Sequence, residues 1–521
     1  MKKSTPSELG ERPIGRLLLE YSVPAIIAST VTSLYNIIDS IFIGRGVGAL
    51  AITGLAITFP MMNLVIAFAT LIAVGGATIS SIFLGQRDEA KATNVLHNVV
   101  VLSLLHSVVF GGLSLLFLDE ILLLFGATPE TLPYARDFMF VVLLGTPIAY
   151  VFIALNNVMR ATGYPTKAMV SALLSVVVNI ILCPIFIFVF DWGIKGAAWA
   201  TVIGQTAAFI WVLSHFMSKK SFVHFSRSAR WVVGPLVKKI YAIGLSPFLI
   251  NTCACVVVVF INKSLLEYGA ADGNMAVGAF GIINRVTMFF LMIVLGVTQG
   301  MQPILGYNYG AGHWDRVKKT LNLGIWVGSC ITVFGFIMME IFPDEVTLMF
   351  NNDPTLLRLS RDGFRIVVLC FPVIGAAIVI RNFFQSIGMP QLSIFLSVTR
   401  QLLFLLPLLM WLPGLWGLDG VWASMAGSDF ISFVVTVLTL IVVQRKLNNK
   451  FGMKHARTAS DKGNSRGGLR ADALAGLCFY GAEYRRQPHH RHNAAQAQHR
   501  RASASGYGQS RPACDGRRGA D

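Results

Sequence analysis

Charged residues are scarce in this sequence. Asp, Glu, Lys and Arg make up 13% of its 521 residues, whereas soluble globular domains carry about 25%. A soluble chain of this length would form about three domains, and three separate domains would need far more polar surface than this sequence can supply. Because 54% of the residues are apolar or aromatic, we predict an integral membrane protein.

The sequence also lacks paired cysteines and the common hydrolase motifs. None of its seven cysteines belongs to a CxxC pair, so neither a zinc site nor a redox pair is indicated. No HExxH or GxSxG segment occurs, and the histidines inside apolar runs, such as His97 and His106, stand alone. An integral membrane enzyme is therefore the less favoured alternative to a transporter, and we expect no cofactor and no resident metal ion.

Twelve apolar segments of membrane-spanning length follow one another along the chain. A transmembrane helix needs about 20 mostly apolar residues. The first segment is too long for a signal-peptide core, so we predict a retained span there. The segments lie at 15–44, 52–83, 94–117, 134–159, 167–190, 195–217, 237–267, 275–303, 318–341, 359–387, 391–413 and 417–445.

Basic residues between these segments gather on one side. Lys and Arg cluster near residues 2–16, 87–91, 160–167, 219–239 and 316–319. The opposite connections are acidic and contain Asp119, Glu120, Glu130, Asp344, Glu345 and Asp353. Because cytoplasmic loops carry the excess of Lys and Arg, we expect both termini in the cytoplasm and a multi-pass location in a bacterial cell (inner) membrane.

Several motifs recur in the same order about 225 residues apart. They are Phe125-x3-Pro129-x6-Arg136-Asp137 with Phe350-x3-Pro354-x6-Arg361-Asp362, Gly163-x-Pro165 with Gly388-x-Pro390, and Trp192-Gly193-x2-Gly196 with Trp416-Gly417-x2-Gly420. Each copy holds six spans, which is the parallel repeat that some transporters use for their two halves. We therefore predict an all-α membrane protein of twelve transmembrane helices in two pseudo-symmetric six-helix lobes.

The predicted organisation follows from this repeat. It comprises a cytoplasmic N-terminus at 1–14, an N-terminal lobe at 15–217, a basic cytoplasmic linker at 218–236, a C-terminal lobe at 237–446 and a disordered basic tail at 447–521.

Polar residues inside the predicted spans of the N-terminal lobe mark a candidate site. Asp39, Asn179, Cys183 and Thr201 are predicted roughly 8–16 Å below the outer surface at 1.5 Å rise per residue, so we expect Asp39, Asn179 and Thr201 to share one pocket. A carboxyl group in a dry site can carry a proton, and oxygen ligands suit hard cations. The alternative is a polar cluster that only packs the helices together. Pro24 lies on the helix of Asp39, so ion binding could be coupled to a bend there.

The C-terminal half carries a different set of charges in its spans. In the repeat, the residue nearest to Asp39 is Asn262, whereas the charged residues are Arg285, Arg400 and Asp429. Arg400 and Asp429 fall at compatible depths on adjacent spans. We therefore predict an intramembrane ion pair between them that stabilises the lobe.

At these residues the sequence resembles the multidrug and toxic compound extrusion (MATE) family, closest to its MepA-like branch. The matching pieces are Asp39 with Ile43-Gly44, the stretch from Asn179 to Cys183, Gly196-Ala197-Ala198-x-Ala200-Thr201, and Gln302-Pro303-x2-Gly306-Tyr307-Asn308-Tyr309-Gly310-Ala311. The resemblance covers about residues 10–446. It implies two six-helix lobes around a central cavity and secondary active efflux of cationic or amphipathic drugs by alternating access in exchange for H⁺ or Na⁺.

The resemblance also assigns roles to the candidate residues. Asp39 would be the coupling carboxylate, with Asn179 and Thr201 as its polar partners. Many members carry Asp where this chain has Cys183, and a thiol offers no negative charge there. The loss of one carboxylate weakens sodium binding more than proton carriage, so we expect H⁺ coupling.

Two further expectations concern partners. A flippase for lipid-linked sugars from the same superfamily is the nearest alternative, but the N-terminal spans lack the cationic residues that would hold a pyrophosphate. We expect organic cations or drugs and membrane lipid as partners, and a monomeric protein.

Most of the basic excess lies in the tail. The net charge is +17, and residues 445–521 contain 16 Lys and Arg against 5 Asp and Glu. The tail is rich in Gly, Ala, Arg, Gln and His and shows no apolar period, which is typical of disorder. The charge therefore does not indicate a nucleic-acid partner.

Overall fold

The computed structural model describes residues 8–218, 221–227, 229–269, 272–350 and 353–464. In these residues the regular structure is entirely helical. Eleven of the described helical stretches are long and apolar enough to cross a membrane. The last of them, Pro390–Asn449, is interrupted at Gly417, whose φ of 58° and ψ of −133° are not helical, so it contains two of the predicted spans. The predicted all-α fold of twelve membrane helices is therefore confirmed.

The N-terminal lobe holds six long helices and two short ones that the hydropathy pattern does not reveal. The long helices are α2 (Ile14–Gly46), α3 (Ala49–Gly85), α4 (Glu89–Leu116), α6 (Leu132–Ala161), α7 (Pro165–Pro184), which continues as the π-helical turn η1 (Ile185–Val189), and α8 (Gly193–Met217). The short helices are α1 (Glu8–Glu11) and α5 (Leu118–Leu124).

The C-terminal lobe repeats this order. It contains α9 (Gly234–Tyr268), α10 (Gly273–Gly310), α11 (Trp314–Ile341), the short α12 (Pro343–Leu348), α13 (Pro354–Val367) with η3 (Val368–Cys370) and α14 (Phe371–Ser386), α15 (Pro390–Val398) with the π-helical segment η4 (Thr399–Leu405), and α16 (Leu406–Asn464). The most buried spans are α6 in the first lobe and α13–α14 in the second.

An ion pair occurs at the same place in both copies of the repeat. Arg136 Nε lies 3.2 Å from Asp119 Oδ1 in the N-terminal lobe. In the C-terminal lobe, Arg361 Nε donates to Asp344 Oδ1 at 2.8 Å. Each pair joins a short helix to the long helix that follows it, so the duplication preserves side-chain contacts as well as helix order.

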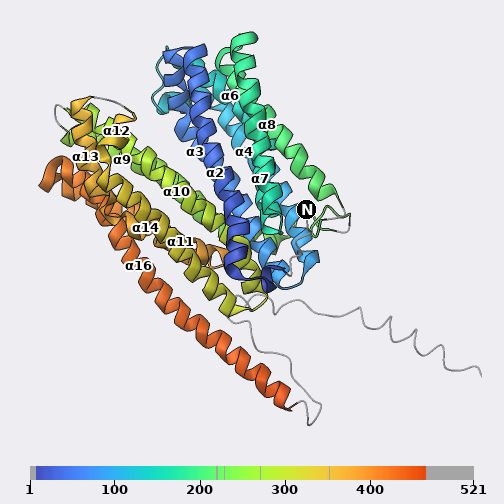
Figure 1. Cartoon of the computed structure of the whole chain (residues 1–521). Coiled ribbons are helices and arrows are strands. Elements are labelled where there is room, and N and C mark those ends of the chain that lie inside the picture. Colours follow the sequence, from blue (N-terminus) through green and yellow to red (C-terminus); the bar gives the residue numbers. More distant parts are fainter. Residues whose placement is uncertain (1–7, 219–220, 228, 270–271, 351–352, 465–521) are drawn as a thin grey trace, which may run out of the picture. The chain divides into compact units, whose positions relative to one another are not determined.

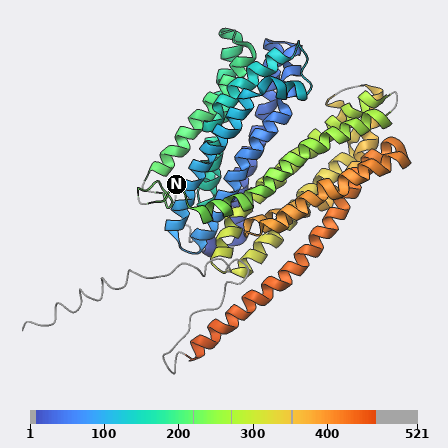
Figure 2. The same cartoon turned by 180° about the vertical axis from the view of Figure 1, so that it is seen from behind.

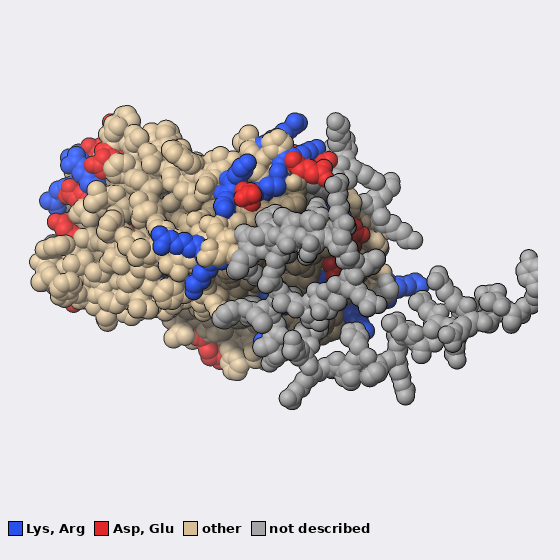
Figure 3. Space-filling view, turned by 90° about the horizontal axis from the view of Figure 1, so that it is seen from below, with Lys and Arg blue, Asp and Glu red and all other residues tan. Residues whose placement is uncertain are grey.

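The surface of the helical body is largely apolar. Figure 3 shows broad areas without charge between small groups of basic and acidic side chains. Large apolar side chains stay exposed on both lobes, including Phe59, Leu124, Trp326, Met349 and Met410. An apolar exterior of this extent fits a bilayer rather than water as the solvent.

The two lobes touch through the halves of α2, α3, α9 and α10 nearest the connection between α8 and α9, which we call the linker end. Figures 1 and 2 show these helices approaching one another there and diverging toward the other end. Glycines of one lobe meet the other lobe's backbone at Gly75–Ile240, Gly85–Tyr307, Gly244–Leu71, Gly296–Ile26, Gly300–Ser22 and Gly310–Ile82. Polar bonds add to this contact, since Gln302 Nε2 donates to Thr78 Oγ1 at 2.7 Å.

The connection between the lobes, residues 218–233, is attached to α4. The backbone N–H of Arg230 donates to Asn94 Oδ1 at 3.0 Å, and that of Val233 donates to Asn98 Oδ1 at 2.8 Å. Two neighbouring asparagines on one helix therefore hold the second half of this connection against the N-terminal lobe.

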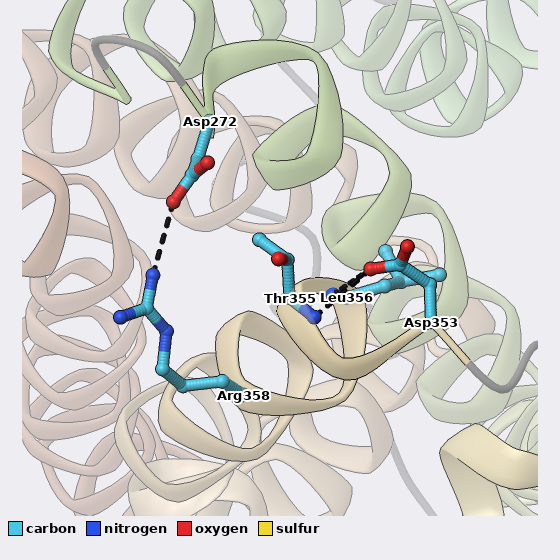
Figure 4. Close-up of polar contacts among 5 residues, drawn as sticks. All are labelled: Asp272, Asp353, Thr355, Leu356 and Arg358. Atoms are coloured by element: carbon cyan, nitrogen blue, oxygen red, sulfur yellow. Dashed lines mark hydrogen bonds and ion pairs between the residues drawn. The ribbon is translucent and has the colours of Figure 1, made fainter.

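The outer connections of the C-terminal lobe are fixed by a helix cap and an ion pair (Figure 4). Asp353 accepts hydrogen bonds from the backbone N–H groups of Thr355 at 2.9 Å and Leu356 at 3.0 Å, which caps α13. One turn later, Arg358 Nη2 lies 3.0 Å from Asp272 Oδ2. The start of α13 is thus joined to the connection between α9 and α10.

The tail differs from the prediction at its start. Residues 447–464 continue α16 as helix, whereas we predict disorder from residue 447. An existing helix extends more easily than a new one forms, and this stretch contains no proline. Contacts divide the chain into Met1–Met453 and Lys454–Asp521; residues 465–521, which hold most of the predicted tail, lie outside the described residues.

Candidate functional site

Asp39 and Cys183 are in direct contact inside the N-terminal lobe. The Cys183 thiol donates a hydrogen bond to Asp39 Oδ1 with an S···O distance of 3.1 Å. Cys183 is fully buried and Asp39 is 7% exposed. The carboxylate on α2 therefore faces a neutral, weak donor on α7 at the position where the sequence comparison expects a second acid.

A second set of hydrogen bonds centres on Thr201 of α8. Asn179 Nδ2 donates to Thr201 Oγ1 at 3.0 Å, and Thr201 Oγ1 donates to the Ala197 carbonyl at 3.1 Å. The Tyr35 hydroxyl lies 3.1 Å from Thr201 Oγ1. Because the single Thr201 proton is used on Ala197, Tyr35 must be the donor in this contact.

The helices bring these residues to one depth. Asp39 lies seven residues before the end of α2 and Thr201 eight residues after the start of α8, or about 10–12 Å from those ends. The crossing of α7 and α8 is close, since a Cβ on Gly204 would lie 2.5 Å from the Ser175 carbonyl oxygen and 3.5 Å from Asn179 Cβ. The predicted residues thus meet where α2, α7 and α8 converge.

Tyr35 is a site residue that the sequence reasoning missed. It lies four residues before Asp39, so the two side chains share one face of α2. That spacing was the available signal, but a tyrosine near the end of an apolar span is also typical of a membrane interface. Tyr35 connects α2 to the Thr201 and Asn179 pair on the neighbouring helices.

Pro24 lies away from this cluster, in the half of α2 nearest the linker end. It lines a small cavity with Asn156, Arg160 and Pro165. The helix α2 runs through it as one element, although proline removes a backbone hydrogen bond. Its role as a bend stays a prediction.

Arg160 in the same cavity joins the two lobes. Its guanidinium donates to Gln299 Oε1 on α10 and to Asn157 Oδ1 within α6. The sequence places Arg160 among the basic connections, because it ends a span. The structure instead buries it at the contact between the lobes.

In the C-terminal lobe, Arg400 and Asp429 form an ion pair. Arg400 Nε donates to Asp429 Oδ1, and the carboxylate is 9% exposed. Arg381 on α14, which the sequence reasoning passed over, is an electrostatic neighbour of both. Arg285 on α10 is exposed and lies outside this group.

The described residues contain no group of three or more His, Cys, Asp or Glu that could hold a metal ion. Among them, the buried acidic side chains are Asp39 and Asp429. Asp429 pairs with an arginine, whereas Asp39 has neutral neighbours. The arrangement can therefore exchange a proton at Asp39 with no charged side chain held against it.

Two kinds of comparison with known proteins agree with this geometry. The MatE family model matches residues 24–185 and 244–411, one segment in each lobe. The multidrug export protein MepA of Staphylococcus haemolyticus (strain JCSC1435) is 27% identical over 425 residues, which cover 81% of this chain and 93% of that protein. MepA of Staphylococcus aureus (strain N315) is 25% identical over 435 residues, covering 84% and 95%.

Solved structures give the same result. The MATE multidrug transporter DinF-BH, solved in complex with the dye rhodamine 6G, is 35% identical with a TM-score of 0.77 and covers 84% of this chain and 98% of its own. A MATE transporter in an outward-facing conformation is 23% identical with a TM-score of 0.80, covering 86% and 100%, which supports the fold alone. The chain belongs to the MatE family, the multidrug and toxic compound extrusion transporters.

Proposed function

We propose that this protein is an antiporter that exports cationic or amphipathic organic compounds in exchange for protons, with Asp39 as the coupling group. The observation that carries the proposal is a buried carboxyl group whose hydrogen-bond donor is the neutral Cys183 thiol. Removal from water favours the protonated form of such a group. Protonation and release at Asp39 would then alternate with substrate binding.

The neighbours of Asp39 favour H⁺ over Na⁺. Sodium is a hard cation that needs several oxygen ligands, and thiol sulfur is a soft ligand. The oxygens of Thr201 and Tyr35 are occupied by hydrogen bonds to one another and to Asn179. A proton needs only the carboxylate itself.

Alternating access is the transport mode that we propose for the two lobes. The lobes contact one another at the linker end through α2, α3, α9 and α10. With both termini in the cytoplasm, as the distribution of Lys and Arg favours, this contact closes the cytoplasmic side and leaves the Asp39 site toward the outside. The location would be a bacterial cell membrane.

Dye transport in everted membrane vesicles tests the proposal. Wild-type vesicles with a proton gradient should accumulate rhodamine 6G, and Asp39→Asn should abolish this accumulation because the amide cannot exchange a proton. Asp39→Glu should retain part of the activity. Asp119→Asn, which removes an acid at the far end of the same lobe, is the matched control and should transport normally.

The driving ion is resolved by a second arm. Vesicles that carry a sodium gradient but no pH gradient should accumulate no dye above background. Sodium-driven accumulation would refute the assignment of H⁺, and transport by Asp39→Asn at the wild-type rate would refute the role of Asp39.

A further inference from the structure

Three charged side chains from three helical segments meet inside the C-terminal lobe. Arg400 projects from the π-helical segment η4 and pairs with Asp429 of α16. Arg381 of α14, the central helix of this lobe, interacts electrostatically with both. We call Arg381, Arg400 and Asp429 the arginine cluster.

The arginine cluster carries an excess positive charge. Arginine stays protonated in proteins, so two guanidinium groups face one carboxylate. No ion pair joins Arg381 to any other acidic side chain in the described chain. An uncompensated charge in a membrane span is costly and usually belongs to a ligand or ion pathway.

The repeat indicates that the fold does not require these charges. At the repeat offset of about 225 residues, the N-terminal lobe has Asn156 in place of Arg381 and Ser175 in place of Arg400. The counterpart of Asp429 is Gln205 at an offset of 224, which aligns Trp192 with Trp416. The first lobe forms the same six-helix bundle with neutral side chains. The charges are thus specific to the second lobe.

The local backbone also sets Arg400 apart. Residues Thr399–Leu405 are π-helical, and such segments concentrate at functional sites because they displace a side chain from the regular helical position. The Arg400 side chain is 30% exposed even while it pairs with Asp429. A ligand can therefore reach the guanidinium without disrupting the ion pair.

We propose that Arg381 and Arg400 form a binding site for an anionic oxygen group, either the carboxylate of a zwitterionic substrate or the phosphate of a lipid. Planar guanidinium groups bind both anions through paired N–H donors. The substrate arm of this inference rests on the proposed function, since it places a cationic end near Asp39 in one lobe and an anionic end at the arginine cluster in the other. The two lobes would then recognise opposite charges.

A pair of dyes with one chromophore tests the inference. Rhodamine 6G is an ethyl ester with a positive charge, and its hydrolysed form, rhodamine 19, carries a free carboxylate in addition. Binding of each dye to the purified full-length protein in detergent is measured by fluorescence anisotropy. Arg381→Gln should weaken rhodamine 19 binding about tenfold, the loss expected for one charge-assisted hydrogen bond, and should leave rhodamine 6G binding unchanged.

Two further variants sharpen the result. Asp429→Asn removes the internal competitor for the guanidinium groups, so rhodamine 19 should bind more tightly to it than to the wild type. Arg285→Gln removes an exposed charge from α10 of the same lobe and should change neither affinity. Melting temperatures of all variants identify any that fail to fold, and the Arg381→Lys variant, which keeps the charge, then replaces Arg381→Gln.

The outcomes separate the inference from the proposed function. Phosphatidylglycerol that displaces rhodamine 19 from the wild type but binds no differently from a neutral lipid to Arg381→Gln identifies lipid phosphate as the natural occupant. Equal losses for both dyes, an equal effect of Arg285→Gln, or no effect of Arg381→Gln on either anion overturns the arginine cluster as an anion site. Absence of rhodamine 6G binding to the wild type instead counts against the proposed function.

Discussion

A single methyl group at Gly300 should separate the two lobes at the linker end. An alanine Cβ there would lie 2.6 Å from Ser22 Cα and 2.4 Å from Ser22 Oγ, whereas carbon atoms pack at about 3.5–4.0 Å. The helices α2 and α10 would have to move apart by about 1 Å to remove this overlap. Overpacking of this kind costs about 1–3 kcal/mol, and a difference of that size shifts a two-state equilibrium by roughly 5- to 150-fold.

Gly281 on the same helix provides the matched control, because a Cβ there would have no atom within 4 Å. Both substitutions should gain about 1 kcal/mol of helix propensity, so the difference between the two variants reports the contact with Ser22. Hydrogen–deuterium exchange is measured over residues 292–310 in the wild type and both variants. Gly300→Ala should exchange faster in this segment, and Gly281→Ala should match or exceed the wild-type protection.

The reasoning has a clear refutation. If Gly300→Ala and Gly281→Ala protect residues 292–310 equally, the α2–α10 contact is not as close as the structure places it. Faster exchange over the whole protein, together with a lower melting temperature, would mean that the overlap unfolds the protein rather than separating the lobes.

Three other predictions follow from the sites described above. Cys183→Asp places a second acid beside Asp39 and should introduce dye transport driven by a sodium gradient; Cys183→Ser is its control, and the absence of sodium-driven transport in Cys183→Asp contradicts the assignment. Arg400→Asp leaves two acids facing one another and should cost about 3–5 kcal/mol of stability, which the double variant with Asp429→Arg should largely restore in a melting assay; a double variant no more stable than the singles argues against the pair. Truncation after Lys454 should leave dye transport intact, and a loss of transport with normal membrane insertion would assign the tail a function.

The sequence predicts the fold well because the bilayer imposes its own length scale. A span needs about 20 apolar residues, so the helices of both lobes are visible as runs between charged connections. The interruption at Gly417 is also visible, because the tryptophan and glycines around it repeat those near Gly193. The short α5 and α12 are not, since seven and six residues are too few to show a pattern.

The candidate site is only partly predictable. Asp39, Asn179 and Thr201 are recognisable as polar residues at one depth, and helix geometry then brings them near one another. Tyr35 and Arg381 are not, because their roles depend on partners from distant parts of the chain. The contacts of glycine with backbone between the lobes are equally hidden, since a glycine in a span has the same local pattern whether or not another helix crosses it.

The attachment of residues 218–233 to α4 changes where the protein can be divided. Since Asn94 and Asn98 hold Arg230 and Val233, this segment folds with the first lobe, and the freely turning joint is confined to the start of α9. Coexpressed halves cut between Val233 and Gly234 should therefore reassemble into an active transporter. Halves cut directly after α8 would leave the asparagines of the first half without their partners and should reassemble poorly.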